Sequence, residues 1–160
     1  TDWVAMASGQ IFTIAQRSNG SLWGFGNNQD GKLGSGDVEW DPNSCLYTFS
    51  TPRAVGAAGS APWVIGGFAV GRRHTVALQT DGTLWSWGKG GQALGFSSDQ
   101  LTPVQLGIGE SWTLPIAAGD SHSLVSRADG TLWAIGTNSF GELGTDGGST
   151  YEPVEVICGE

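Results

Sequence analysis

Short apolar runs, separated by glycines and by Asp-Gly or Asn-Gly pairs, make up most of this chain. None of these runs continues at the 3.6-residue spacing of an amphipathic helix. The clearest stretch runs from His74 to Gln79, turns at Thr80-Asp81-Gly82, and returns from Thr83 to Gly88. Because an Asx-Gly pair between two apolar runs is a strong hairpin signal, this pattern predicts two antiparallel strands joined by a tight turn.

The hairpin pattern occurs three times, over Gly9–Gly34, Gly71–Gly95 and Gly119–Gly144. Equivalent residues are separated by 62 positions and then by 48, and the shared slots are Gly20, Gly82 and Gly130; Trp23, Trp85 and Trp133; and Gly26, Gly88 and Gly136. Further strand candidates precede each first glycine (4–7, 68–70, 116–118) and follow each later proline (54–55, 104–106, 154–157). Such self-similarity marks a repeat architecture with about four short strands in each unit.

The predicted strands carry small or apolar residues on both faces, as in Thr75 to Leu78 and Leu84 to Trp87. Four-stranded sheets buried on both faces are typical of β-propeller blades, whereas a β-sandwich does not require the same turn chemistry in every unit. We therefore predict an all-β fold of three four-stranded antiparallel blades, with repeats at about 1–56, 57–107 and 108–160.

Three blades leave two outer blade faces uncovered, and soluble proteins rarely expose large apolar patches. The sequence therefore predicts an incomplete propeller completed by further blades, half of a six-bladed ring made with a second copy, or a module laid against another protein. The chain starts at Thr1 rather than Met, which favours a segment of a longer propeller or a processed product.

A family resemblance follows from four short motifs: Gly-x-x-His-Ser/Thr, Asp-Gly-Thr-Leu-Trp, Gly-x-Asn-x-x-Gly-x-Leu-Gly and Pro-x-x-Val. The third copy matches at Gly119, His122, Ser123, Asp129, Gly130, Trp133, Gly136, Asn138, Gly141, Leu143, Gly144 and Pro153. The first copy departs at Phe12, and the second has Gly90 in place of the Asn and one residue fewer. This pattern resembles the repeats of the regulator of chromosome condensation family. Kelch repeats are disfavoured, because the Gly-Gly pairs occur at different places in the three repeats.

The resemblance implies a β-propeller, seven-bladed in well-known members, whose faces bind other proteins. Roles in the family include guanine-nucleotide exchange on a small GTPase, adaptor or scaffold duties, and inhibition of enzymes by secreted forms. Because one fold carries all of these roles, the fold by itself selects none of them.

Composition narrows the classes of partner. The net charge is −8 with only 7 Lys and Arg, so no basic stripe is available for nucleic acid. No apolar run approaches the roughly 20 residues of a membrane span, so we expect no membrane insertion. Cys45 and Cys158 lie at non-equivalent repeat positions and determine neither the redox state nor the compartment. Low Lys with abundant Gly, Ser and Thr favours a bacterial or viral extracellular setting, and a cytoplasmic one stays open.

The two histidines, His74 and His122, share one repeat slot, and Phe12 occupies that slot in the first copy. A catalytic or metal-binding role would not survive the change to Phe, so we interpret the slot as structural, with a hydrogen bond between loop and strand or between blades. We interpret the repeated tryptophans as packing residues. The sequence contains no nucleophile–base pair, no set of metal-ligating residues and no phosphate-binding loop. We therefore predict that the protein is not an enzyme and binds no cofactor.

The residues just before this slot change completely between copies: Gln10-Ile11, Arg72-Arg73 and Asp120-Ser121. Arg72 and Arg73 could anchor an acidic partner loop, or else form a solvated loop tip. The insertion at 37–50 carries three aromatic candidates for partner contact, Trp40, Tyr47 and Phe49, with loop packing as the alternative.

From these patterns we predict a non-enzymatic interaction or scaffold module that binds through its loop faces or assembles into a larger or oligomeric propeller. The alternative is a regulator of a partner enzyme, either an exchange factor for a small GTPase or a secreted inhibitor.

Overall fold

The computed structural model describes residues 2–40, 47–56 and 58–157, and these form three separate four-stranded antiparallel sheets. The first sheet contains, in spatial order, β1 (Trp3–Ser8), β2 (Phe12–Arg17), β3 (Leu22–Asn27) and β4 (Thr48–Ala54). The second contains β5 (Trp63–Val70), β6 (His74–Gln79), β7 (Leu84–Gly88) and β8 (Gln100–Leu106). The third contains β9 (Trp112–Ala118), β10 (His122–Arg127), β11 (Leu132–Gly136) and β12 (Thr150–Glu155). A short 3-10 helix, η1 (Gln92–Leu94), lies in the loop between β7 and β8. The predicted all-β fold of three blades is confirmed.

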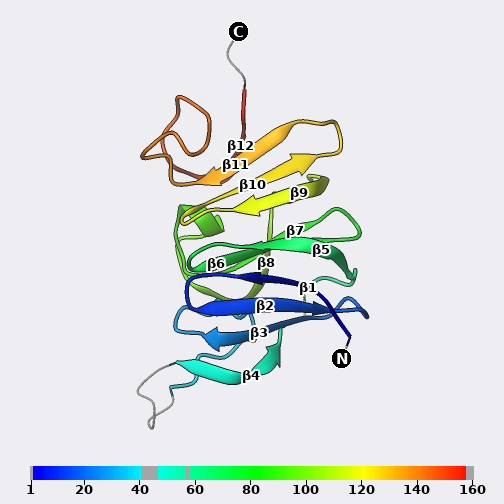
Figure 1. The fold of residues 1–160 in the computed structure, drawn as a ribbon. Coiled ribbons are helices and arrows are strands. Elements are labelled where there is room, and N and C mark those ends of the chain that lie inside the picture. The colour runs from blue at the N-terminus through cyan, green and yellow to red at the C-terminus, as the bar shows by residue number, and fades with distance from the viewer. Residues whose placement is uncertain (1, 41–46, 57, 158–160) are drawn as a thin grey trace.

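The three sheets follow one another in space in chain order, as Figure 1 shows. The first strand of the middle blade, β5, contacts β1 of the blade before it and β9 of the blade after it. The first strands therefore form the shared inner edge of the arc. The turns that leave them lie at the same end of the blades as the loop residues 28–40, 89–99 and 137–149, on the left in Figure 1.

The opposite end carries three copies of the predicted Asx-Gly turn. Gly82 has a φ of 83°, which a residue with a Cβ rarely adopts, and Gly20 and Gly130 have φ values of 84° and 88°. The Asp81 carboxylate accepts hydrogen bonds from the Thr83 amide at 3.0 Å and hydroxyl at 2.7 Å, and Trp85 Nε1 donates to the same hydroxyl at 2.8 Å. Each turn thus fixes the position of the tryptophan that follows it.

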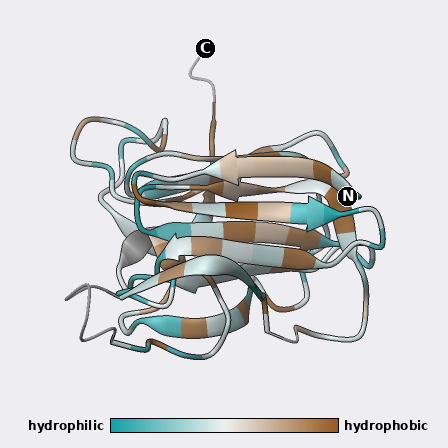
Figure 2. Cartoon of the chain, turned by 60° about the horizontal axis from the view of Figure 1, so that its bottom comes forward, coloured by the Kyte–Doolittle hydropathy of each residue, from teal (hydrophilic) through white to brown (hydrophobic). Residues whose placement is uncertain are grey.

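The hydrophobic core lies between neighbouring blades as well as within them. One cluster joins the first two blades: Phe12, Ile14, Leu22, Leu33, Phe49, Phe68, Ala77 and Trp87. The other joins the second and third: Leu78, Leu84, Leu106, Trp112, Val125 and Ile135. Figure 2 shows brown, apolar segments along several of the strands. Consecutive blades therefore stabilise one another by apolar burial.

The tryptophans of the repeat slot pack less deeply than the sequence suggested. Trp23, Trp85 and Trp133 are half-buried, and Trp87 is the tryptophan with 0% exposure, lying between the first two blades. Its Nε1 donates to the Lys32 carbonyl at 3.1 Å across that junction.

The fourth strands begin earlier than predicted. The expected strands started after Pro52, Pro103 and Pro153, but β4, β8 and β12 each contain that proline. Each is an edge strand, where a residue without an N–H is tolerated. Consequently Thr48–Ser50 belongs to β4 rather than to the predicted insertion.

The aspartates of the Asx turns make the stability of the fold depend on pH in the acidic range. Hydrogen bonds from Thr83 lower the pKa of Asp81 below its ordinary value of 3.8, and those from Thr131 do the same for Asp129. A lowered folded-state pKa gives stability that is present above pH 3.8 and is lost as pH falls through the folded value. The first turn has Asn19 in this slot, which shows that a neutral amide fits there.

We therefore predict that the double substitution Asp81→Asn with Asp129→Asn keeps the fold at pH 7 and loses less stability than the parent chain between pH 5 and pH 2.5. Urea unfolding followed by tryptophan fluorescence at each pH measures this. An acid sensitivity equal to that of the parent chain would contradict the assigned role of the two carboxylates.

Candidate functional site

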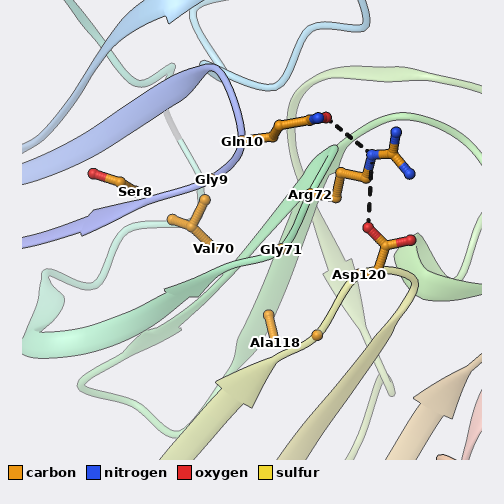
Figure 3. A pocket seen from close by; sticks show the side chains of 9 residues that line it. Ser8, Gly9, Gln10, Val70, Gly71, Arg72, Ala118 and Asp120 are labelled. Carbon is orange, nitrogen blue, oxygen red and sulfur yellow. Dashed lines mark hydrogen bonds and ion pairs between the residues drawn. The ribbon is translucent and has the colours of Figure 1, made fainter.

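Three equivalent turns meet at the inner edge of the arc and surround a depression of about 590 Å³, which we call the mouth. Its lining comes from all three blades: Ser8, Gly9, Gln10, Val70, Gly71, Arg72, Ala118, Gly119 and Asp120. Figure 3 shows these residues converging from the ends of three separate strands.

Glycine at the start of each turn allows this convergence. A Cβ built on Gly9 would lie 2.7 Å from the Gly71 carbonyl oxygen, and one on Gly71 would lie 2.6 Å from the Gly119 carbonyl oxygen. Both distances are shorter than real Cβ contacts allow. The inner strands can therefore approach one another only because these slots carry no side chain.

Arg72 is the central side chain of the mouth. Its Nε donates to Gln10 Oε1 at 2.9 Å and lies 3.7 Å from Asp120 Oδ1, so one residue from each blade takes part. The side chain is about half exposed, and the two terminal nitrogens point away from both partners in Figure 3. The guanidinium is thus held by its inner edge and presents its outer edge to solvent.

Arg73 has a different environment from its neighbour. It forms a two-pronged ion pair with the buried Asp30 of the first blade, in which Nε donates to Oδ2 at 3.0 Å and Nη2 donates to Oδ1 at 3.2 Å. Lys32 and Lys89 also lie within 4 Å of that carboxylate, at 3.5 and 3.7 Å. Burial lowers the pKa of Lys32, and the Asp30 charge opposes that effect. Arg73 therefore ties two blades together, and its partner Asp30 was missed because it lies in a variable loop slot.

His74 also joins two blades. Its Nε2 lies 2.8 Å from the Ser123 hydroxyl of the third blade, and the bond is buried. Burial lowers its pKa from 6.5 to about 4, with a smaller contribution from the charge on His122 opposed by Asp120. A side chain at Gly71 would overlap the ring. His74 is therefore neutral at pH 7, and its buried ring packs between the second and third blades and forms a hydrogen bond across their junction.

The aromatic candidates of the insertion divide into two groups. Trp40 is 50% exposed and packs edge-on against Tyr47, with ring centroids 5.0 Å apart. Phe49 is buried at 7% exposure in β4, beneath the Arg53 guanidinium at 4.5 Å from its centroid. Phe49 therefore belongs to the core, which corrects its prediction as a partner contact.

Cys45 of the insertion and Cys158 lie outside the described residues. Among residues 2–40, 47–56 and 58–157, no group of three or more His, Cys, Asp or Glu side chains could hold a metal ion. Within the same ranges, no helix has the length and apolar character needed to cross a membrane.

Comparison with known families explains the repeat slots. A model described as the Regulator of chromosome condensation (RCC1) repeat matches residues 67–92 and 116–142, and a second model with the same description matches residues 19–78. Together the matches cover more than half of the chain. The chain belongs to the RCC1 repeat family. The blades described above are therefore RCC1 repeats, as the sequence motifs predicted.

Curated relatives match the chain over part of their length. It is 35% identical over 104 residues to the ultraviolet-B receptor UVR8 of Arabidopsis thaliana, which covers 63% of this chain and 21% of the receptor. It is 30% identical over 131 residues to human protein RCC2, which covers 79% of this chain and 23% of RCC2.

Solved structures share the fold over nearly the whole chain. Human WBSCR16 superposes with a TM-score of 0.80 at 20% identity, over 97% of this chain and 39% of that one. Prp20p of Saccharomyces cerevisiae superposes with a TM-score of 0.78 at 21% identity, over 98% and 39%. The chain thus spans about two fifths of these two solved chains and less than a quarter of these two curated relatives.

The buried His74 ring generates a prediction for stability against pH. A folded-state pKa near 4 means that only the unfolded chain gains a proton between pH 6.5 and pH 4, so stability present above 6.5 is lost as pH falls. The full loss corresponds to a free energy of unfolding on the order of 3 kcal/mol.

The substitution His74→Phe places in this slot the residue that Phe12 supplies in the first repeat. We expect it to lower stability at pH 7, through loss of the Ser123 hydrogen bond, and to flatten the dependence between pH 6.5 and 4. Chemical unfolding at stepped pH measures both effects. An unchanged slope in the variant would assign the pH dependence to other groups.

Proposed function

We propose that this chain is a non-enzymatic protein–protein interaction module that binds a partner protein at the mouth. The observation that carries the proposal is the contrast between constant backbone and variable side chains. The three turns share a backbone hydrogen bond. The amides of Asn27, Lys89 and Thr137 donate to the carbonyl oxygens of Ile11, Arg73 and Ser121, respectively. Yet the turns present Gln10, Arg72 and Asp120 side by side.

The chemistry of the mouth suits a polar partner loop carrying a carboxylate. Arg72 is held through its Nε, so little side-chain freedom is lost when its outer edge pairs with an anion. A planar guanidinium accepts a carboxylate through two parallel hydrogen bonds. Asp120 and Gln10 add acceptors beside it, which select against a uniformly acidic surface.

The insertion extends the proposed surface at the same end of the blades. Trp40 exposes half of its ring there, next to Tyr47, and large aromatic rings with a polar edge are frequent anchors in protein interfaces. Trp40, Tyr47, Arg72 and Arg73 are therefore the residues of the predicted set that can meet a partner, since the Arg73 side chain is 47% exposed beside its ion pair, whereas Phe49 is buried.

The alternative to a simple interaction module is a regulator of a partner enzyme. An exchange factor must bind the nucleotide-free form of a small GTPase more tightly than the nucleotide-bound form, because a ligand shifts an equilibrium only by its differential affinity. Accelerated release of a fluorescent guanine nucleotide from a small GTPase on addition of this chain would support that role. Binding without accelerated release would support the module alone.

The direct test places a photoreactive amino acid at Gln10, beside Arg72 in the mouth, and, in a matched control, at Ala128 in an Asx turn of the opposite end. We expect protein adducts in extracts of the source cells from position 10 and few from position 128. Charge reversal by Arg72→Glu, combined with a photoreactive group at Gln10, should reduce the adduct roughly tenfold, because a like charge then faces the partner carboxylate.

Equal labelling from both ends, or adducts that are unaffected by Arg72→Glu, would contradict binding at the mouth. Far-ultraviolet circular dichroism of each variant verifies that the sheets remain intact. Since residue 72 is half exposed, the substitution leaves the core unchanged.

A further inference from the structure

We propose that a hollow between the second and third blades binds the carboxylate of an aspartate or glutamate side chain of the partner protein. The hollow has a volume of about 280 Å³ and lies beside the mouth, since Asp120 lines both. We call it the side hollow. The inference rests on the partner binding proposed above and adds a second contact for the same partner.

At the junction of the first two blades, the chain places a carboxylate of its own between a repeat loop and the turn of the next blade. This carboxylate belongs to Asp30, whose side chain is 5% exposed. Arg73, Lys32 and Lys89 surround it, with nitrogen–oxygen distances of 2.9, 3.5 and 3.7 Å. The first junction therefore shows that the space between two blades at this end accepts an acidic side chain.

The turn of the third blade carries small hydroxyl residues in the slots of two of these cations. The Lys89 amide donates to the Arg73 carbonyl, and the Thr137 amide donates to the Ser121 carbonyl, at 2.9 Å in each case. Ser121 is therefore equivalent to Arg73, and Thr137 is equivalent to Lys89. Both Ser121 and Thr137 line the side hollow.

The loop of the second blade is one residue shorter than the loop of the first and also carries small residues. Counting back from the buried leucine of each loop, Ala93 stands in place of Lys32 and Gly91 in place of Asp30. A Cβ built on Gly91 would meet no atom of the described residues within 4 Å. The side hollow is thus the counterpart of the Asp30 position, lined by residues too small to fill it.

Two cations of the second blade line the side hollow. The side chains of Arg73 and Lys89 are 47% and 43% exposed. Arg73 pairs with Asp30 through Nε and Nη2, so its Nη1 lies outside that pair. Lys89 Nζ lies 3.3 Å from Asp99 and 3.7 Å from Asp30. A carboxylate that enters the side hollow can accept charge-assisted hydrogen bonds from Arg73 Nη1 and Lys89 Nζ.

The basic residues of this acidic chain are concentrated at this place. Four of the seven Lys and Arg residues lie in the mouth, in the side hollow or against Asp30: Lys32, Arg72, Arg73 and Lys89. Because the whole chain has a net charge of −8, this local concentration of basic groups is the part of the surface that attracts an acidic group.

Asp120 favours a carboxylate over a phosphate. It lines the side hollow from the third blade, and its own carboxylate lies 3.7 Å from Arg72 Nε. Repulsion between like charges grows with their magnitude, so Asp120 opposes an anion with two charges more than an anion with one. The class of ligand is therefore a singly charged acidic side chain.

The mouth and the side hollow together select a partner surface with two neighbouring acidic residues. One carboxylate pairs with the outer edge of Arg72, and the other enters the side hollow beside Arg73. Two linked contacts bind more tightly than either contact alone, because the second forms within a complex that is already assembled.

The site is tested without a partner by nuclear magnetic resonance titration of the isotope-labelled full chain. The probe is a capped tripeptide with a central glutamate, and the matched peptide carries glutamine. We expect saturable shifts of the Gly90, Gly91 and Ser121 amide signals with the glutamate peptide alone. Lys89→Gln should weaken this binding about tenfold, because it removes a charge-assisted hydrogen bond. Arg53→Gln, which removes an equally exposed cation from β4, serves as the control and should bind like the parent chain.

A second variant fills the side hollow without a change of charge. Ser121→Ile introduces the residue that Ile11 supplies in the equivalent slot of the first blade, so the backbone accepts it. This variant should lose the saturable shifts, while far-ultraviolet circular dichroism verifies that the sheets remain intact. Equal binding of the glutamine peptide, binding that survives Ser121→Ile, or tighter binding of inorganic phosphate than of the glutamate peptide would overturn the proposal.

The partner's use of the site is tested with the photoreactive group at Gln10. Ser121→Ile should reduce the adduct about tenfold, because one charge-assisted contact is lost. An adduct that Ser121→Ile leaves unchanged would overturn the contact in the side hollow and leave binding at the mouth in place. Absence of any adduct from the parent chain would contradict binding at the mouth, and the tripeptide titration then decides on the side hollow by itself.

Discussion

The close approach of the inner strands at Gly9, Gly71 and Gly119 is the constraint on which the remaining structure depends. The carbonyl oxygen of one glycine lies against the Cα of the equivalent glycine in the blade before it, and no side chain fits between them. This contact sets the spacing of the blades at the inner edge. It also brings three turns close enough for Gln10, Arg72 and Asp120 to meet.

Each junction between blades combines this constant backbone contact with variable side chains. The Phe12 or His74 ring lies under its glycine, and the loop glycines receive the side chains of the next blade. Around these fixed points the chain uses an ion pair between the half-exposed Arg73 and the buried Asp30 at one junction and a buried imidazole–hydroxyl bond at the other. The repeated fold therefore leaves the side chains of the mouth free to differ between the three repeats, as Gln10, Arg72 and Asp120 do.

Much of the fold could be predicted from the sequence, because short-range signals determine it. The Asx-Gly pairs predicted the three hairpins, and the recurrence of this pattern three times predicted the three blades. Strand starts near Pro52, Pro103 and Pro153 were missed, since edge strands accept proline and alternation there is weak. For the candidate site, the change of side chain between the three repeats pointed to Arg72. The pairing of Arg73 with Asp30 could not be predicted, because these residues are 43 positions apart in sequence and meet only where two blades pack together. Burial of Phe49 likewise follows from strand pairing that the insertion conceals.

The most direct measurement of the glycine constraint is the free energy of unfolding of Gly71→Ala, compared with Gly148→Ala. A Cβ at residue 71 would overlap the His74 ring and the Gly119 carbonyl, while residue 148 has no atom within 4 Å of a built Cβ. We expect Gly71→Ala to lose about 3 kcal/mol of stability, the upper range for overpacking a well-packed core, and Gly148→Ala to change little. Equal stability of the two variants would contradict the view that the inner glycines set the blade spacing and so build the mouth.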